Sequence, residues 1–389
     1  MKIGIDKLGF YTPHLYVDMN KLAVARGIDP EKYTIGIGQE KMAVPPPTQD
    51  AVTMAANAAK NILDESDKED IDFVIFATES GVDHSKAAAL YVHRLLGINP
   101  HARCIELKQA CYGATAGIQM AKGHITLHPE SKVLVLGADI ARYGLNTGGE
   151  PTQGAGAVAM VISRHPNIMV LEDDNVYLSA DIMDFWRPVY ADTAFVNGKF
   201  SNEQYLAFFS QIWTAYKEKT GLTLDDFAAI CFHVPYTKMG IKALRTILDE
   251  GNEKTEERLQ AYYQMSTYYN RIVGNIYTGS LYLSLLSLLE RNTDLSAGSR
   301  IGLFSYGSGA VGEFFSGTLQ PDYRTYLHAR EHEKRLSSRK ELTVAEYEAI
   351  FEESLPTDGS TVELDTTHDP APICLAGVTA HQRQYVNKQ

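Results

Sequence analysis

The sequence predicts an α/β fold built from two related halves. Residues 72–79 and 226–233 each begin with Asp-Phe, continue as a short apolar run, and end on an ionisable side chain. Their length and their β-branched and aromatic residues favour strands. Segments with small and apolar residues at helical spacing lie between such strands. Strands that alternate with helices are typical of α/β proteins.

A second pair of segments predicts that the halves arose by internal duplication. VLVLGAD at 133–139 leads to GAGAVAMVI at 154–162, and IGLFSYGSGAV at 301–311 leads to GEFF. Both copies contain Gly-x-Gly-Ala-Val, beginning at Gly154 and at Gly307. Because both pairs occur in the same order, we expect two similar domains, residues 1–166 and 167–389, with RHPNI closing the first.

Five helices are expected between the strands, and a sixth is expected in the C-terminal segment. Ser201 and Gln204 have the spacing of a capping box, and the apolar stripe from Tyr205 to Tyr216 ends near Gly221. The segment 341–370 contains nine acidic residues and no Lys or Arg, and it opens with capping-box spacing at Thr343. It predicts a surface helix followed by a mobile acidic stretch. The other expected helices are 50–63, 111–125, 255–273 and 275–290.

Composition excludes several classes of protein. The chain has 389 residues, 44% hydrophobic and 22% charged, with a net charge of −12, as in ordinary globular proteins with a large core. The absence of a basic cluster argues against nucleic acid as a partner. No apolar run reaches the ~18 residues of a membrane helix, and the N-terminus does not resemble a signal peptide, so a cytosolic location is expected. Four cysteines then predict reduced thiols.

Cys111 is the candidate nucleophile. It lies in KQACYGATAG, where a helical pattern begins, and a helix N-terminus favours thiolate over thiol. A plain buried cysteine is the alternative.

Glu79 and His233 end the two repeated strands, so the duplication would bring them to one cleft. A partly buried carboxylate is suited to general acid–base chemistry, and an imidazole can polarise a carbonyl or move a proton. A solvated strand end and a structural histidine are the alternatives. Asn275 opens a helix, as a cap or as a ligand. The backbone of the small-residue turn 305–309 could approach an oxyanion.

Two other patterns do not support a site. Residues 307–312 match G-x-G-x-x-G, but EFFSGTLQ after them predicts a strand instead of the helix that a dinucleotide site requires. His124 and His128 have i, i+4 spacing, but Ile125 replaces the glutamate of a zinc protease. No metal site and no phosphate-binding loop is predicted.

Seven motifs are distributed over residues 29–313. They are DPEKYTIGIGQ (29–39), FATESGVD (76–83), KQACYGATAG (108–117), GGEPTQGAGAVAM (148–160), CFHVPYTKMGIKAL (231–244), GNIYTGS (274–280) and GLFSYGSGAVGE (302–313). With these motifs, the chain resembles bacterial hydroxymethylglutaryl-CoA synthases. That family has the thiolase fold, two duplicated α/β halves in a five-layer αβαβα sandwich. The resemblance implies that acetyl-CoA and acetoacetyl-CoA are condensed to HMG-CoA in the mevalonate route to isoprenoids, by a homodimer, without metal or redox cofactor.

The resemblance also implies residue roles. Cys111 carries the acetyl group, Glu79 removes a methyl proton, His233 polarises acetoacetyl-CoA, and Asn275 holds its carbonyl. Lys238 and Lys242, four residues apart, could present two cations to the CoA phosphates. The other implied substrate contacts are Asp29, Tyr143, Thr152, Ser201 and Ser308.

Three alternatives remain at this stage. A β-ketoacyl-carrier-protein synthase shares the fold but uses Cys, His and Asn, so Glu79 and CFHVPYTK favour the HMG-CoA family. A polyketide-associated HMG synthase would act on an acyl carrier protein and would need a docking surface. A non-catalytic acyl-CoA-binding protein would have no need for Cys111, Glu79 and His233 together.

Overall fold

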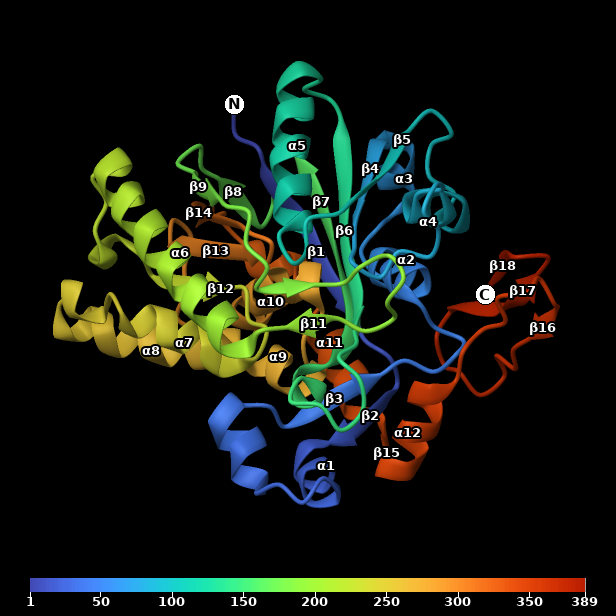
Figure 1. Ribbon diagram of the computed structural model, residues 1–389. Coiled ribbons are helices and arrows are strands. Elements are labelled where there is room, and N and C mark those ends of the chain that lie inside the picture. Colours follow the sequence, from blue (N-terminus) through green and yellow to red (C-terminus); the bar gives the residue numbers. More distant parts are fainter. Residues whose placement is uncertain (389) are drawn as a thin grey trace.

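The computed structural model of the protein describes residues 1–388. In this part of the chain, ten strands form one mixed sheet in the order β12-β13-β14-β8-β1-β7-β6-β4-β5, with β9 paired to β14 (Figure 1). The strands are β1 (Gly4–Tyr11), β4 (Ile71–Ala77), β5 (Arg103–Leu107), β6 (Lys132–Ala141), β7 (Gly154–Ser163), β8 (Met169–Leu171), β9 (Val176–Ser179), β12 (Ala229–Phe232), β13 (Arg300–Gly307) and β14 (Val311–Leu319).

The sheet contains the same strand arrangement twice. β1-β7-β6-β4 on one side corresponds to β8-β14-β13-β12 on the other. In both sets the first two neighbouring pairs are antiparallel and the third is parallel. β8 joins the sets by pairing antiparallel with both β1 and β14. The division of the chain at residues 166 and 167 stays a prediction.

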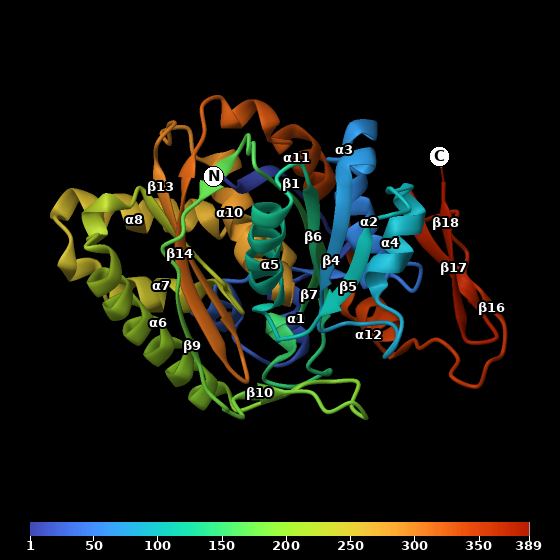
Figure 2. The same cartoon turned by 90° about the horizontal axis from the view of Figure 1, so that it is seen from above.

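Helices alternate with the two sets of strands in layers (Figure 2). α2 and α4 cover one face of the first set, and α5 and α10 lie between the two sets. α6, α7 and α8 lie beyond the second set. This αβαβα arrangement is the one expected for a thiolase-like fold. The helices are α2 (Ala51–Lys60), α4 (Ala88–Leu96), α5 (Gly113–Leu127), α6 (Gly198–Thr220), α7 (Thr237–Arg245), α8 (Glu253–Ser266) and α10 (Ser280–Arg291).

The start of α6 corrects a sequence-based expectation. The helix begins one turn before the predicted cap, and the Asn197 side chain accepts a hydrogen bond from Phe200 N. Ser201 therefore lies inside the helix, and its hydroxyl donates to Asp184 Oδ2 at 3.1 Å. The helices expected at 255–273 and 275–290 are also divided, with α9 (Tyr268–Val273) following α8 and the turn η5 (Tyr277–Gly279) preceding α10.

The end of the C-terminal segment packs against α2, the helix that covers the first set of strands. α12 (Val344–Glu352) begins with the predicted capping box of Thr343 and Glu346. In the acidic stretch after it, β16 (Val362–Glu363) pairs with β17 (Ile373–Thr379), and Asp369 is buried and accepts hydrogen bonds from Thr48 and Gln49. The expected mobility of this stretch stays a prediction.

Shorter elements complete the described chain. They are β2 (Leu15–Asp18), α1 (Met19–Ala25), η1 (Lys32–Ile37), β3 (Lys41–Val44), α3 (Glu65–Asp70), η2 (Glu150–Thr152), β10 (Phe185–Trp186), β11 (Phe195–Val196), η3 (Leu224–Asp226), η4 (Leu248–Glu250), η6 (Tyr323–Tyr326), α11 (Ala329–Ser337), β15 (Lys340–Leu342) and β18 (Gln382–Asn387). Among residues 1–388, no helix combines the length and apolarity needed to cross a membrane.

Candidate active site

The site is built where corresponding strands of the two sets end. Glu79 follows β4, and His233 follows the corresponding strand β12. Cys111 lies two residues before α5, directly after Ala110, whose φ of 44° turns the chain sharply. Because corresponding strand ends face the same region, the predicted acid–base pair and the nucleophile come together although the sequence separates them widely.

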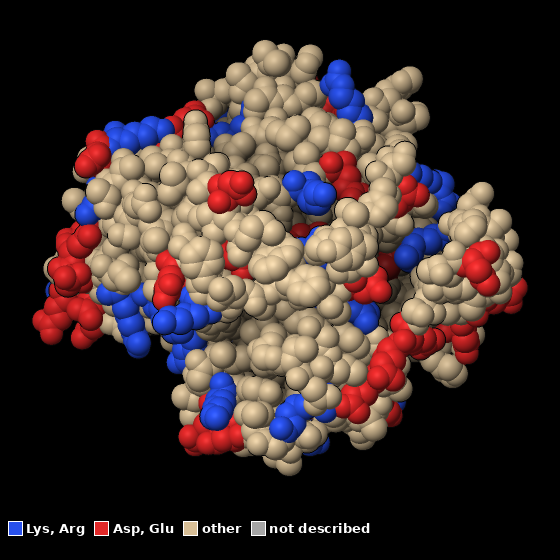
Figure 3. Space-filling model, viewed as in Figure 1, with Lys and Arg blue, Asp and Glu red and all other residues tan. Residues whose placement is uncertain are grey.

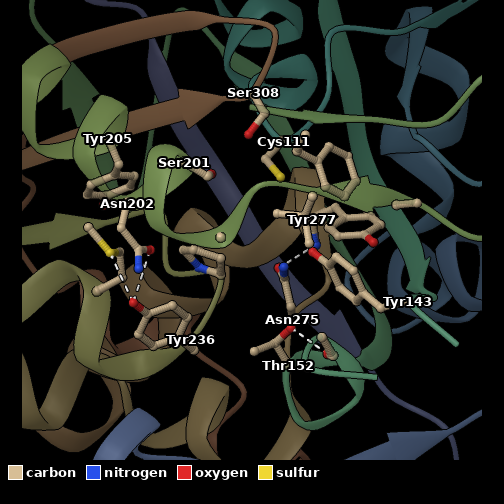
Figure 4. A pocket seen from close by; sticks show the side chains of 18 of the residues that line it. Cys111, Tyr143, Thr152, Ser201, Asn202, Tyr205, Tyr236, Asn275, Tyr277 and Ser308 are labelled. Atoms are coloured by element: carbon tan, nitrogen blue, oxygen red, sulfur yellow. Dashed lines mark hydrogen bonds between the residues drawn. The ribbon is translucent and has the colours of Figure 1, made fainter. Parts of the chain in front are cut away.

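Cys111 and His233 line a cavity of about 760 Å³, whereas Glu79 does not line it and contacts Cys111. Figure 4 shows Cys111 on one side of it and Asn275 below, with aromatic rings on two walls. Of the residues expected in the site, those that line the cavity are Cys111, Tyr143, Thr152, Ser201, His233, Asn275 and Ser308.

Cys111 and Glu79 are in direct contact. The Cys111 thiol donates to Glu79 Oε1, with Sγ and Oε1 3.4 Å apart. Burial, and then the negative charge of Glu79, raises the pKa of Cys111 well above its usual value. The structure therefore favours a thiol at Cys111 over the thiolate expected from the helix N-terminus, with Glu79 as the hydrogen-bond acceptor of that thiol.

Burial also raises the pKa of Glu79, and the neighbouring Asp139 carboxylate raises it further. Asp139 ends the apolar run of β6 and is fully buried. It accepts hydrogen bonds from Glu79 N at 2.6 Å and from Thr278 Oγ1 at 2.6 Å. Asp139 thus fixes the backbone of the base and links it to the segment that carries Asn275. Sequence reasoning missed this role, although an acidic residue inside VLVLGAD was its visible signal.

His233 is held by its backbone and leaves its ring free for a ligand. Its N–H donates to the Phe304 carbonyl at 2.8 Å, and its carbonyl accepts from Tyr205 Oη at 2.6 Å. Burial lowers the pKa of His233 to about 3, so the ring is neutral near pH 7. Within residues 1–388, the buried His233 Nδ1 has no hydrogen-bond partner.

Asn275 is held through its side-chain oxygen. Its Oδ1 accepts from Tyr277 N at 2.9 Å and from Ser280 Oγ at 2.8 Å. Nδ2 is buried without a partner in the described part of the chain. A side-chain amide whose oxygen is fixed presents its N–H₂ group outward as a donor. Asn275 is therefore a preorganised donor, and it lies before the helix instead of capping it directly.

Asp184 is a hydrogen-bond acceptor for residues that line the cavity. It is buried and accepts from Ser201 Oγ, Tyr306 Oη and Gly309 N. The Gly309 N–H thereby has a partner within the protein, and the approach of the other N–H groups of residues 305–309 to an oxyanion stays a prediction. Sequence reasoning also missed Phe185 and Tyr277, whose rings make T-shaped contacts with Tyr143. In the sequence, only the aromatic character of these two residues could have pointed to them.

Three of the residues implied as substrate contacts lie outside the cavity. Asp29 is exposed and accepts a hydrogen bond from Glu31 N. Lys238 and Lys242 lie on α7, and Lys242 Nζ contacts the hydroxyl of Tyr236, a cavity residue, at 3.3 Å. Lys238 lines a separate hollow of about 170 Å³.

Metal chemistry finds no support in the arrangement of side chains. Across residues 1–388, no group of three or more His, Cys, Asp or Glu side chains could hold an ion. His124 pairs with Asp72 Oδ1 at 3.0 Å. The four cysteines are free thiols in the structure.

The comparisons with known proteins agree on one family. The model of the hydroxymethylglutaryl-coenzyme A synthase N terminal matches residues 1–167, and that of the C terminal matches 175–265 and 245–357. A hydroxymethylglutaryl-CoA synthase of Enterococcus faecalis is 54% identical over 387 residues, which covers both chains completely. The chain belongs to the hydroxymethylglutaryl-CoA synthase family.

Solved members of the family have the same fold. An HMG-CoA synthase complexed with CoA is 46% identical, covers both chains completely, and superimposes with a TM-score of 0.97. The family also includes carrier-protein enzymes. The polyketide 3-hydroxy-3-methylglutaryl-ACP synthase of Bacillus subtilis is 33% identical, over 90% of this chain and 88% of its own. The rival β-ketoacyl-carrier-protein synthase is not favoured.

Proposed function

We propose that the protein condenses acetyl-CoA with acetoacetyl-CoA to give HMG-CoA and CoA, as an acyltransferase of the mevalonate pathway. The observation that carries the proposal is the 3.4 Å contact between Cys111 Sγ and Glu79 Oε1, beside a cavity lined by Cys111, His233 and Asn275. A nucleophile, a base and two neutral polar side chains around one cavity are what an acyl transfer followed by a carbon–carbon condensation requires.

Acetylation comes first. As Cys111 Sγ attacks the carbonyl carbon of acetyl-CoA, the Glu79 carboxylate accepts the thiol proton. The C–S bond to CoA breaks, and the CoA thiolate leaves with that proton, so Glu79 is again a carboxylate. The raised pKa of Glu79 makes it a stronger base than an exposed glutamate.

Condensation uses the same carboxylate. Glu79 removes a proton from the methyl group of the acetyl thioester, and the resulting carbanion attacks the ketone carbon of acetoacetyl-CoA. His233, neutral because its pKa is lowered, donates a hydrogen bond that polarises that ketone. The new alkoxide takes up the proton that Glu79 removed from the methyl group, so Glu79 is again a carboxylate. Asn275 Nδ2 donates to a substrate carbonyl. Water then hydrolyses the thioester, which releases HMG-CoA and restores the Cys111 thiol.

Substrate binding extends from the cavity to α7. We assign Tyr143, Thr152, Ser201 and Ser308 to the acyl and pantetheine portions. Lys238, Lys242 and Asp29 lie outside the cavity, and we assign them to the CoA nucleotide. The two domains and the cytosolic location remain proposals from the sequence, and the homodimer and the absence of a cofactor remain proposals from the family resemblance.

Mass measurement of the intact chain after incubation with acetyl-CoA tests the proposal. One acetyl adduct is expected, and Cys111→Ser should abolish it. Cys104→Ser, a change at a second partly exposed thiol, is the matched control and should keep the adduct. Absence of an adduct in the unmodified protein would refute the mechanism. Parallel incubation with an acetylated carrier protein separates the two donors: faster acetylation by the carrier would favour the polyketide type.

A further inference from the structure

The acidic helix α12 contacts one wall of the substrate cavity through a buried polar network. The wall is the segment 143–152, which contributes Tyr143, Thr147, Gly148, Gly149 and Thr152 to the cavity. Beyond η2, this segment has no helix or strand of its own. Its conformation therefore depends on contacts with neighbouring elements.

Glu150 is the centre of the network. Its side chain is only 1% exposed. Arg26 donates to both carboxylate oxygens at 2.8 Å, and the backbone N–H of Asn146 donates to Oε2 at 3.0 Å. A bidentate arginine and a backbone donor hold a carboxylate in one orientation. Glu150 thereby ties the cavity segment to the end of α1.

α12 supplies the remaining partners. Tyr347 Oη donates to Glu150 Oε1 at 3.2 Å and accepts from Gln153 Nε2 at 2.9 Å. The other end of that amide, Gln153 Oε1, accepts from Tyr143 N at 2.7 Å. A single buried hydroxyl on α12 thus reaches both ends of the cavity segment, through a carboxylate and through an amide.

A second residue of α12 holds the arginine. Glu348 Oε1 accepts from Arg26 Nη1 at 2.6 Å, so Arg26 lies between two carboxylates. One turn further, the Phe351 ring lies under the Arg142 guanidinium, 4.0 Å from its centre, and the Phe351 carbonyl accepts from Arg142 Nη2. Three side chains on one helix therefore contact the cavity segment, its neighbour Arg142 or the arginine that holds Glu150.

We propose that α12 positions the cavity wall for substrate, with Tyr347 and Glu348 as positioning residues that act through Glu150 and Gln153. The proposal rests on the proposed function, because it assigns the wall to acyl-CoA binding. It predicts that removing the Tyr347 hydroxyl leaves Cys111 chemistry intact and weakens substrate binding, since the free enzyme must then order the wall when substrate binds.

Tyr347→Phe is the decisive variant, since it keeps the ring and removes only the hydroxyl. The KM for acetyl-CoA should rise about three- to tenfold, as expected for one or two lost hydrogen bonds, while kcat changes less than about twofold. Amide hydrogen exchange of residues 143–152, without substrate, should become faster. Glu348→Gln should act in the same direction. Glu352→Gln, an exposed carboxylate on the same helix, is the charge-matched control and should change neither.

A double-mutant cycle distinguishes positioning from a general loss of stability. If Tyr347 acts through Glu150, then Tyr347→Phe should add little to the KM of Glu150→Gln. A lower unfolding temperature with unchanged KM and unchanged exchange at 143–152 would overturn the proposal, as would additive effects in the cycle. If the unmodified protein showed no synthase activity, the proposed function would fail. Hydrogen exchange and CoA affinity would still test the positioning role separately.

Discussion

At the residue scale, Glu79 is the carboxylate to which we assign the proton transfers of the proposed reaction. Glu79 contacts the Cys111 thiol, and its backbone N–H donates to Asp139. The Arg187 guanidinium donates to the Glu79 carbonyl. The base is thus held by its main chain from two sides, which leaves its side chain free to accept a proton from sulfur or from carbon.

Glu79→Gln should separate acetylation from condensation. The amide keeps the size of the side chain but cannot act as a base. The acetyl adduct on Cys111 should still form, more slowly, because solvent can accept the thiol proton, and HMG-CoA production should fall by about 10²-fold or more. Adduct mass and product formation measure the two steps. Production at the unmodified rate would remove Glu79 from the role of base.

Glu79→Gln should also change how stability depends on pH. The folded state raises the pKa of Glu79, so the unfolded chain loses this proton at lower pH than the folded protein does. The glutamate therefore destabilises the fold progressively as pH rises above about 4, the value of an unperturbed glutamate. Glutamine does not titrate. Unfolding temperatures should diverge in favour of the variant as pH increases, and parallel curves would contradict this.

At the element scale, close backbone crossings place the cavity residues. Gly274 has φ +92°, and an added Cβ would lie 2.1 Å from the Gln153 carbonyl oxygen. It precedes Asn275 and forms an isolated bridge with Gly154 at the start of β7. The orientation of Asn275 therefore depends on a glycine pair that joins the two repeated halves, and both glycines lie within the family motifs.

Gly274→Ala should lower stability by about 2 kcal/mol or more, because strain in φ and a steric clash add together. It should also reduce condensation by displacing Asn275. Gly123→Ala is the matched control. This glycine is exposed in α5 with no atom within 4 Å of an added Cβ, so alanine should stabilise by about 0.5–1 kcal/mol. Denaturant titration measures both, and equal effects would contradict the assignment.

At the scale of the whole molecule, charge is unevenly distributed. Residues 341–370 hold nine of the twelve excess negative charges. Acidic side chains gather over α12 on the face shown in Figure 3. The rest of the chain is almost balanced, so an anionic CoA ester meets little overall repulsion, and we propose that local cations on α7 guide its approach.

Lys238→Gln and Lys242→Gln should each raise the KM for acetyl-CoA about two- to fivefold at low salt, the range of exposed ion pairs. The difference from the unmodified enzyme should shrink as ionic strength increases, because salt screens exposed charges. Lys254→Gln, an exposed residue of α8 outside the cavity, removes the same charge and should have no effect. A KM increase that is independent of salt would indicate a role other than charge.

The sequence predicted the strand ends, the duplication and most of the site because these follow from local patterns. Two apolar runs that end on Glu79 and His233 are visible without coordinates. Helix boundaries were less predictable. Ser201 has capping-box spacing, yet Asn197 caps the helix, because both asparagine and serine can accept from the backbone and only the chain path selects between them.

By itself, the sequence determined which residue types could carry the chemistry, since apolar periodicity and the family motifs are local properties. The tertiary structure decided their protonation. Burial beside Glu79 keeps Cys111 a thiol, against the expected influence of the helix N-terminus. The tertiary structure also decided the partners of the acidic segment, because Tyr347 contacts Glu150 and Gln153, which lie nearly two hundred positions away in the sequence. Desolvation and long-range contact depend on how the chain is packed, and no sequence spacing encodes them.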